Sequence, residues 1–142
     1  MLNEYEITDD RHRIDLRAVH EFMSDVSWGR WRTHEIIDQQ VTEAWRVVTA
    51  HTRSDAAMVG FARAFSDGVS VAYLADVYVS PQHRGHGLGM ALIDAMIESG
   101  PGQSFKWMLH THDAHGLDAK FGFKPATSAY LERASPLAPP LT

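Results

Sequence analysis

The sequence predicts one mixed α/β domain in which helices flank a mostly antiparallel central sheet. Three apolar runs rich in Val, Tyr, Phe and Trp follow one another in the middle of the chain, separated by the turn signals TRSDA and SDG. This order is typical of an antiparallel meander. Segments with a helical spacing of apolar residues stand before and after these runs. With 142 residues, of which 44% are hydrophobic, the chain is long enough to bury one core.

The first elements are expected to be a strand over residues 2–7 and a helix over residues 9–26. Asp9 or Asp10 is the expected N-cap, because an aspartate can accept a hydrogen bond from a free N–H of the first helical turn. A second helix is expected from about Thr33 to Val41, where apolar residues again recur at helical spacing.

Three strands are expected next, over residues 44–51, 58–67 and 69–79. The third run is nearly all apolar apart from Asp76, as expected of a central strand that is covered on both faces. Helical spacing then predicts a helix over residues 88–99, which the sequence GPG ends.

The remaining chain completes the domain and adds a tail. Three elements are expected here: a strand over residues 104–111, a short helix over residues 113–121 capped by Asp113, and a last strand over residues 124–133. The domain therefore spans residues 1–133, and the proline-rich residues 134–142 are expected to form a coil.

The composition excludes several functions. The chain has no cysteine, so it holds no cysteine nucleophile, iron–sulfur cluster or thiolate zinc site. Its formal net charge of −5 argues against a nucleic-acid binder, which needs a basic face. The acidic start of the chain shows no signal-peptide pattern, and no apolar run approaches the ~20 residues of a membrane span. We therefore expect a cytoplasmic protein with no nucleic-acid or membrane partner.

Three glycines at alternate positions, Gly85, Gly87 and Gly89, stand directly before the helix that follows the meander. A glycine-rich turn at a helix start points backbone N–H groups and the positive end of the helix dipole at one spot, which suits an anion. A nucleotide P-loop would need Lys and Ser or Thr where the chain has Met90 and Ala91. A dinucleotide fingerprint would need the spacing G-x-G-x-x-G in a parallel unit. Neither pattern fits, and the alternative to an anion site is a tight connection without a ligand.

Two segments carry a family resemblance. Residues 82–89, QHRGHGLG, match the motif Q/R-x-x-G-x-G/A of the GCN5-related N-acetyltransferases (the GNAT family), and residues 73–98 resemble that family's fourth strand, pyrophosphate loop and third helix. Residues 112–125, HDAHGLDAKFGFKP, resemble its second signature, a short helix that closes in a sequence of the type lYekfGF. The resemblance implies the GNAT fold, acetyl-CoA as the cosubstrate, no metal, and direct acetyl transfer to an amine without a covalent enzyme intermediate.

The resemblance also implies where acetyl-CoA binds. Main-chain groups of Val77 and Val79, on a strand that parts from its neighbour, would pair with the pantetheine arm. The residues whose main-chain N–H groups would hold the pyrophosphate are Arg84, Gly85, His86, Gly87, Leu88 and Gly89. The side chains of Arg84 and His86 either add charge near the phosphates or are solvated loop residues.

Direct transfer needs a base, because an alkylammonium with a pKa near ~10 is mostly protonated at neutral pH. Asp76 is the carboxylate of the central strand, but strand alternation puts it on the face opposite Val77 and Val79. In family members with a strand base, that base aligns with Ala75 instead. We therefore expect Asp76 to be structural and hydrogen-bonded to the backbone. Further candidates come from the two early helices: His20, Glu21, His34 and Glu35.

Direct transfer also needs an acid for the departing thiolate. The tyrosine that usually serves in the family falls at Asp118. An aspartate with a pKa near ~3.9 would need that pKa raised by ~3 units, or about 4 kcal/mol, to act as an acid at neutral pH. We expect that Asp118 is not the general acid. The remaining candidates are Tyr73, Tyr78, Tyr130, His112 and water, unless the thiolate leaves unprotonated.

The loop between the two early helices, SWGRWR, is a candidate wall of the acceptor pocket, because the family shapes that pocket with the corresponding loop. An arginine there would imply an acceptor that carries a carboxylate or phosphate. The candidate residues are Trp28, Arg30, Trp31 and Arg32. The alternatives are a protein-binding patch or tryptophans that only anchor the loop.

Five histidines could suggest a metal site, but no carboxylate pattern completes a ligand set. We expect these histidines to be solvated or hydrogen-bonded: His83, His86, His110, His112 and His115.

The sequence therefore predicts an acetyl-CoA-dependent N-acetyltransferase that acts on a primary amine of a small molecule. One alternative is a non-catalytic acetyl-CoA sensor or regulatory module that has kept the loop and lost the acid. Another is an acetyltransferase that acts on a protein or peptide amine. Dimerisation is common in the family, so a homodimer is a further expectation, although nothing in the sequence locates its interface.

Overall fold

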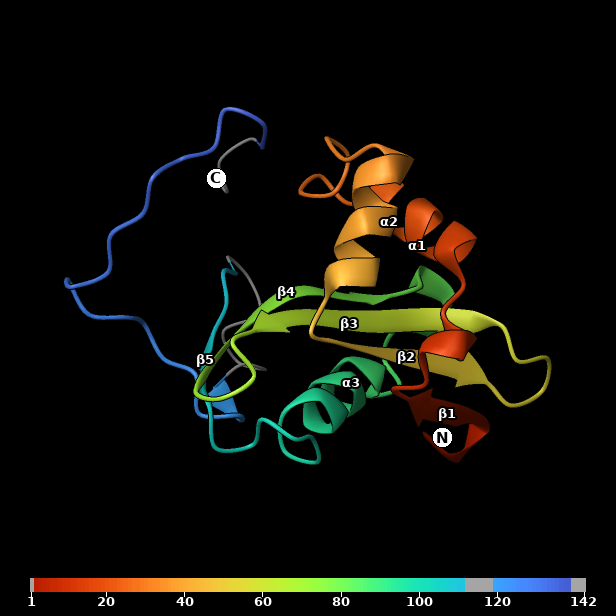
Figure 1. Ribbon diagram of the computed structural model, residues 1–142. Coiled ribbons are helices and arrows are strands. Elements are labelled where there is room, and N and C mark those ends of the chain that lie inside the picture. The colour runs from red at the N-terminus through yellow and green to blue at the C-terminus, as the bar shows by residue number, and fades with distance from the viewer. Residues whose placement is uncertain (1, 112–118, 139–142) are drawn as a thin grey trace.

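Residues 2–111 and 119–138 are described by the computed structural model, which places one sheet between helices on its two faces (Figure 1). The strands are β1 (Tyr5–Thr8), β2 (Arg46–Thr52), β3 (Met58–Ser66), β4 (Val71–Val79) and β5 (Lys106–Met108). The helices are α1 (Leu16–Ser24), α2 (His34–Glu43) and α3 (Leu88–Met96). Short 3-10 turns lie at η1 (Leu2–Glu4), η2 (Arg11–Arg13) and η3 (Pro81–His83).

The sheet has the strand order β1-β2-β3-β4-β5. Strands β1 to β4 pair antiparallel, and β5, which the chain reaches through α3, pairs parallel to β4. Figure 1 shows α1 and α2 on one face of the sheet and α3 on the other. The mixed α/β class with a mostly antiparallel sheet flanked by helices is confirmed.

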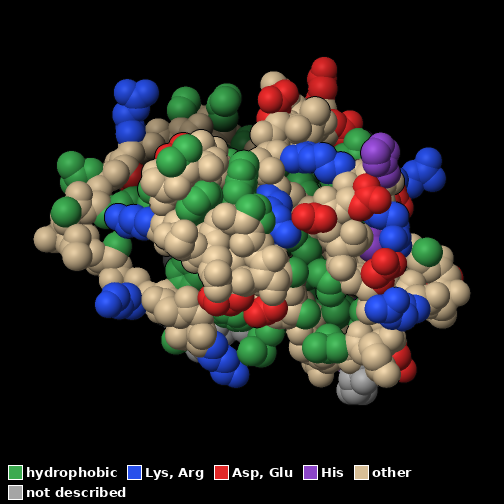
Figure 2. All heavy atoms as spheres, turned by 60° about the horizontal axis from the view of Figure 1, so that its bottom comes forward, with side chains coloured by type: hydrophobic (Ala, Val, Ile, Leu, Met, Phe, Trp, Pro, Cys, Tyr) green, Lys and Arg blue, Asp and Glu red, His purple; other side chains and the backbone are tan. Residues whose placement is uncertain are grey.

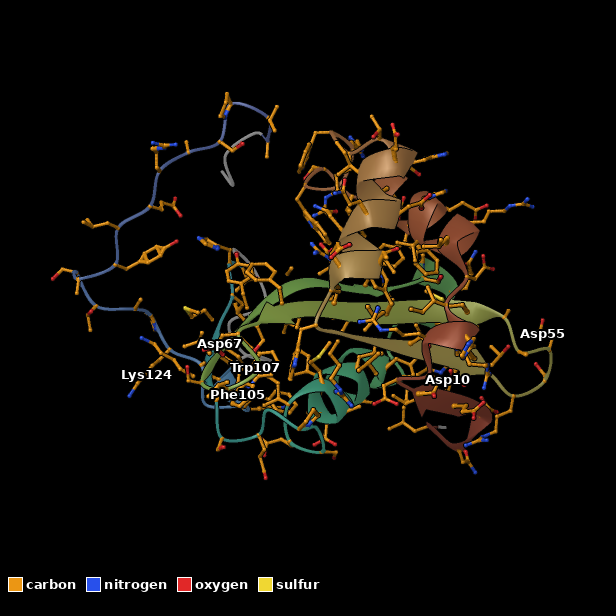
Figure 3. All side chains as sticks on the ribbon, in the orientation of Figure 1. Asp10, Asp55, Asp67, Phe105, Trp107 and Lys124 are labelled. Carbon is orange, nitrogen blue, oxygen red and sulfur yellow. The ribbon has the colours of Figure 1, made fainter. Side chains whose placement is uncertain are left out.

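The turn between β3 and β4 is built around Asp67. Its Oδ1 accepts hydrogen bonds from the N–H groups of Val69, Ser70 and Val71 at 2.9, 2.8 and 3.1 Å. The hydrogen bond from the Ser70 hydroxyl, together with these three backbone bonds, lowers the pKa of Asp67. Figure 3 labels Asp67 at this turn and Asp55 at the β2–β3 turn, at opposite ends of the sheet. The SDG turn signal is therefore satisfied by the side chain of its own aspartate.

The sheet separates two apolar cores. On one face, α3 buries Leu88, Leu92, Ile93 and Met96 against β2, β3 and β4. On the other face, α1 and α2 bury Val19, Phe22, Ile37 and Val41 together with Phe61 and Tyr78. Each such apolar side chain contributes roughly 1.5–3 kcal/mol through burial, so both helical layers hold the sheet in place.

A bulge in β4 decides which of its side chains face which core. Arg63 of β3 pairs with Asp76, but the next residue of β3 pairs with Leu74, so Ala75 is an extra residue in β4. Leu74 packs into the core under α3, whereas Tyr78, beyond the bulge, packs into the core under α1 and α2. Asp76, opposite Arg63, lies on the same face as Tyr78.

The first helix starts later than the sequence predicts. Asp10 caps only the 3-10 turn η2, by accepting from the N–H of His12, and Ile14 is extended at φ −71° and ψ 123°. Asp15 is the N-cap of α1, because its side chain accepts from the N–H of Ala18. The expected caps Asp9 and Asp10 are therefore wrong. Figure 3 labels Asp10 in the segment ahead of α1.

The C-terminal end also differs from expectation. Residues 124–133 form no strand and are exposed, in part because Pro125 has no N–H to give to a ladder. Strand β5 is shorter than expected, at Lys106–Met108. Most of the helix expected over residues 113–121, with its cap Asp113, lies outside the described residues. The described residues of the tail, 134–138, lie on the surface.

Charged groups are mixed on the α3 side of the molecule. Figure 2 shows Lys and Arg side chains scattered among Asp and Glu on this face, without a continuous basic patch among the residues drawn in colour. Across the described part of the chain, no helix has the length and apolar character that crossing a membrane requires.

Candidate active site

The loop between β4 and α3 leaves main-chain N–H groups without partners at the first turn of α3. Gly87, the N-cap of α3, has a φ of 83° and offers no side chain to the helix, and Gly85 has a φ of 82°. Both values lie in the left-handed region, which glycine adopts at little cost. Since the first N–H groups of a helix have no acceptor within it, this end of α3 favours negative charge.

Gly89, in the first turn of α3, is not required by the fold. It is not among the glycines with a positive φ, and a Cβ placed on it would meet no atom within 4 Å. A glycine inside a helix is about 0.5–1 kcal/mol less favourable than alanine. The missing side chain therefore leaves room for a ligand against the main chain, and a bulky pyrophosphate group fits such a place.

The second half of β4 has an open edge. Pairing with β5 ends at Tyr73, whereas β4 continues to Val79. The N–H of Ser80 donates to the carbonyl of Val59 on β3 at 2.8 Å. Because the peptide groups of alternate residues point to opposite edges of a strand, those of Val77 and Val79 face away from β3. Within the described ranges no strand pairs with them there.

Arg84 holds a positive charge beside this edge. Its Nε donates to the carbonyl oxygen of Val79 at 2.8 Å, and its guanidinium carbon lies 5.5 Å from the centre of the Tyr78 ring. The side chain is exposed, but these contacts fix its direction. Arg84 therefore adds charge at the point where the open edge of β4 meets the glycine loop.

The two histidines of the loop lie beside Tyr5 of β1. The Tyr5 hydroxyl bonds to Nδ1 of His83 at 2.8 Å, and the Tyr5 ring meets both imidazoles edge to face. Nδ1 of His86 is buried and has no hydrogen-bond partner in the described part of the chain. A buried polar atom without a partner is costly, so His86 is a candidate contact for an anion at this loop.

Asp76 lies in a buried ion cluster and not against the backbone, so its expected partners are wrong. Nη1 and Nη2 of Arg32 donate to its two carboxylate oxygens at 2.9 and 3.0 Å, and Nε of Arg63 donates at 2.7 Å. The Asp76 side chain is 1% exposed. Burial by itself raises the pKa of Asp76, but the two arginines outweigh burial and lower that pKa. An ionised carboxylate held by three donors is unsuited to take a proton from a substrate.

The loop between α1 and α2 directs one arginine inward and one outward. The guanidinium carbon of Arg32 lies 5.8 Å from the ring centres of both Trp28 and Trp31, and Trp28 packs against the core under α1 and α2. Arg30 is exposed and donates to the last carbonyl of α1 at 3.4 Å. Since Arg32 is committed to Asp76, it is not available for an anionic acceptor as the sequence reasoning expected.

A hollow of about 320 Å³ lies between α2 and β3. Its walls are Ile36, Gln39, Gln40, Glu43, Ala44, Arg63 and Phe65. Arg63 therefore links the hollow to the Asp76 cluster. Sequence reasoning missed this residue, although a single charge inside the apolar run of β3 is the same signal that drew attention to Asp76 in β4.

Tyr78 has its hydroxyl occupied. It donates to Oδ2 of Asp25 at 2.7 Å, and its ring stacks on Phe22 at 4.6 Å between ring centres. Burial and the bond to Asp25 raise the pKa of Tyr78 to about 12. The hydroxyl thus stays protonated and directed at the end of α1, which is a structural role.

Of the four candidates on the early helices, two histidines stack on each other and two glutamates lie in solvent. Nε2 of His20 lies 2.6 Å from Oδ1 of Asp38, and the imidazole of His34 stacks on that of His20 at 3.9 Å. Glu21 and Glu35 are exposed. None of these four candidates is brought to the open edge of β4 by a contact among the described residues.

A second polar cluster joins β4 to the C-terminal segment. The hydroxyl of Tyr73 bonds to Nδ1 of His110, and Nε2 of His110 lies 3.2 Å from Oε2 of Glu132. The hydroxyl of Tyr130 donates to the same oxygen at 2.7 Å. Sequence reasoning named Tyr73 and Tyr130 separately and missed Glu132, since no local pattern connects residues that lie 37 and 22 positions from His110.

Several predicted positions fall outside the described residues, namely Asp118, His112 and His115. Among the residues that the structure does describe, no group of three His, Cys, Asp or Glu side chains could hold a metal ion. His83 bonds to Tyr5 and His110 to Tyr73 and Glu132, which fits hydrogen-bonded histidines.

Comparison with known proteins agrees with this geometry. The model of the acetyltransferase (GNAT) family matches residues 15–123. A crystal structure from Xanthomonas campestris pv. campestris, assigned to the GNAT family, is 32% identical over 93% of this chain and 94% of its own, with a TM-score of 0.85.

Two further structures resemble the chain in fold alone. One is a protein assigned as an acetyltransferase from Deinococcus radiodurans, at 23% identity and a TM-score of 0.75 over 94% of this chain and 91% of its own. The other is glucosamine-6-phosphate N-acetyltransferase from Arabidopsis thaliana, at 12% identity and a TM-score of 0.64 over 92% of this chain and 97% of its own. A search of curated proteins found no match.

Proposed function

This chain belongs to the acetyltransferase (GNAT) family, and from that premise we propose that it transfers an acetyl group from acetyl-CoA to a primary amine of a small molecule. Members of the family transfer an acyl group to an amine and use acetyl-CoA as cosubstrate. The proposed domain covers residues 1–133, with residues 134–142 as a tail.

The observation that carries the proposal is that two main-chain sites follow each other at the end of β4. The open edge at Val77 and Val79 leads directly into the glycine loop, and the loop ends at the first turn of α3. The pantetheine arm has amide groups that can pair with a strand edge, and pyrophosphate needs N–H donors with no Cβ in the way. The residues proposed to hold acetyl-CoA are Val77, Val79, Arg84, Gly85, His86, Gly87, Leu88 and Gly89.

Bound acetyl-CoA supplies a thioester whose carbonyl carbon an amine can attack. Main-chain N–H groups on the open edge of β4 can donate to the carbonyl oxygen as it gains negative charge. These donors are fixed by the pairing of β4 with β3, so they need no rearrangement during the reaction.

The acceptor is proposed to bind in the hollow between α2 and β3. Its volume of about 320 Å³ is at the small end of the range for ligand pockets, and a small amine would fit within it. Glu43 can hold an ammonium group, and Arg63 can hold an anionic group, because among the described residues only its Nε has a hydrogen-bond partner. Arg63, in the wall of the hollow, is held by Asp76, and Asp76 is held by Arg32. Trp28 and Trp31 pack beside Arg32 and so act on the hollow only indirectly.

The proposal is tested by measuring acetyl-CoA binding and CoA release with the same protein. We expect acetyl-CoA to raise the melting temperature, because a ligand that binds only the folded state stabilises it. We also expect thiol release that depends on one class of small amine in a panel that includes peptides. Saturable binding without acceptor-dependent release would indicate a sensor, and release only with peptides would indicate a peptide acceptor. A lack of binding would overturn the proposal.

A further inference from the structure

We infer that Tyr73, His110 and Glu132 form a proton relay for the transfer reaction, with Tyr73 as the group that contacts the acceptor amine. This inference rests on the proposed function and names the base that the family resemblance leaves open. The relay joins three parts of the chain: β4, the segment just after β5, and the C-terminal segment.

Tyr73 stands between the two proposed binding places. It is the last residue of β4 that pairs with β5, so the open edge of β4 begins directly beyond it. Its ring stacks on Phe65 at 5.0 Å between ring centres, and Phe65 lines the hollow proposed for the acceptor. Tyr73 therefore packs against a wall residue of the acceptor hollow and lies at the residue where the open edge of β4 begins.

The hydrogen bonds define a direction for proton movement. A carboxylate only accepts hydrogen bonds, so Nε2 of His110, 3.2 Å from Glu132, carries the N–H. In the neutral imidazole this leaves the lone pair of Nδ1 facing the Tyr73 hydroxyl, which donates to it. The order hydroxyl, imidazole, carboxylate is that of a catalytic triad, with a phenol in place of an alcohol.

The groups that face His110 support this arrangement. Besides Tyr73 and Glu132, the Tyr130 hydroxyl lies 3.4 Å from Nε2 of His110 and donates to Glu132. Bonds from Tyr130 and His110 lower the pKa of Glu132, which keeps it ionised. The His110 side chain is 37% exposed, so it can return a proton to solvent.

The other candidate bases are already engaged. Asp76 is held by two arginines, and Tyr78 donates to Asp25. His20 bonds to Asp38 on the outer helices. Of the candidate groups in the described residues, Tyr73 is the one whose ring packs on a residue of the hollow and whose hydroxyl is bonded to a histidine.

The transfer step moves one acetyl group and two protons. The amine nitrogen forms the C–N bond to the acetyl carbon, and the C–S bond breaks with its electron pair left on sulfur. The proton on nitrogen passes to the Tyr73 oxygen while the Tyr73 proton moves to Nδ1 of His110, and Glu132 stabilises the imidazolium. Of the two protons that the acceptor ammonium loses, one ends on sulfur and one in solvent, so no oxidant or further reactant is required.

The kinetic test uses Tyr73→Phe, His110→Gln and Glu132→Gln with the best acceptor from the amine panel. General acid–base groups contribute about 10²–10⁴ in rate, so we expect kcat to fall about 100-fold in Tyr73→Phe and His110→Gln. The Kd for acetyl-CoA should stay within about twofold, because these side chains do not belong to the proposed main-chain site. In Glu132→Gln the acid limb of the pH–rate profile should move to lower pH, since the imidazolium loses its counter-charge. His12→Gln is the matched control, because His12 also lies 3.2 Å from a carboxylate but sits in the turn η2.

A second readout needs no activity. In the protein without ligands, nitrogen NMR of His110 should show a protonated Nε2 and an unprotonated Nδ1, and Glu132→Gln should weaken this preference. The relay is overturned if Tyr73→Phe and His110→Gln keep kcat within about threefold of wild type, or if Nδ1 carries the proton. A wild-type protein that binds no acetyl-CoA would instead overturn the proposed function, and these two failures are distinct.

Discussion

The glycine loop and the face of β4 under α1 and α2 differ in the groups that they offer to a ligand. At the loop, binding groups are peptide N–H groups arranged by Gly85, Gly87 and the start of α3. On the face under α1 and α2, chemistry depends on side chains held by distant partners, as Asp76 is by Arg32. The first kind of site can be recognised from a short sequence motif. The second kind consists of residues that are distant in the sequence and meet only in the folded chain.

The largest expected effect is a loss of stability when the Asp76 cluster is broken. Asp76→Asn leaves Arg32 and Arg63 buried without their counter-charge, and breaking such a buried pair costs about 3–5 kcal/mol. Chemical denaturation should show this loss in the free energy of unfolding. The exposed Glu35→Gln should change it by less than about 0.5 kcal/mol. A loss below about 1 kcal/mol in Asp76→Asn would contradict the importance of the cluster.

The stability difference between wild type and Asp76→Asn should also depend on pH. The pKa of Asp76 is lower in the folded state than its ordinary value of about 4. Its ionised form therefore stabilises the wild type above that pH, and this stabilisation is lost as the pH falls through the folded-state pKa. The stability gap between wild type and Asp76→Asn should shrink in acid, and an unchanged gap would argue against ionised Asp76.

The next largest effect is expected at the loop. Gly89→Val puts a branched side chain into the open space beside the α3 N-terminus, so the Kd for acetyl-CoA should rise about 100-fold, or about 2.7 kcal/mol. Met90→Val is the matched control, because it places the same side chain one residue later on the exposed side of the helix. Calorimetric titration should separate them, and equal affinities would remove the loop from the binding site.

The smallest effect is expected from the charged side chain at the loop. Arg84→Ala should weaken acetyl-CoA binding by no more than about fivefold, or about 1 kcal/mol, because exposed charges contribute little. Arg17→Ala, on the exposed side of α1, should leave the affinity unchanged. A loss above about 50-fold in Arg84→Ala would mean that side-chain charge and not the main chain dominates binding.

The elements that local patterns define could be predicted from the sequence. The meander, the glycine loop and the start of α3 lie where turn residues and helical spacing put them, although α3 ends at Met96 and not at Ser99. The predicted start of α1 was wrong because three nearby aspartates can each cap a helix. Ile14 is extended, so the helix begins after it and Asp15 is its N-cap. The last strand was wrong because Pro125 has no N–H for a ladder, and residues 124–133 pair with no strand of the described sheet.

The side-chain clusters could not be predicted. Arg32 and Arg63 lie 44 and 13 positions from Asp76, and the bulge at Ala75 decides which face Asp76 takes. The sequence pattern correctly put Asp76 opposite Val77 but could not name its partners. Glu132 contacts His110 from residues 124–133, which were predicted to form a strand and do not.

The central claim is that acetyl-CoA binds to the main chain of β4 and the glycine loop. Its most direct measurement is an NMR titration of the backbone amides with acetyl-CoA. We predict that the largest shifts fall on the N–H groups of Val77, Val79 and residues 85–89, and that Gly89→Val needs about 100-fold more acetyl-CoA to produce them. Saturable binding that leaves these amides unmoved would contradict it.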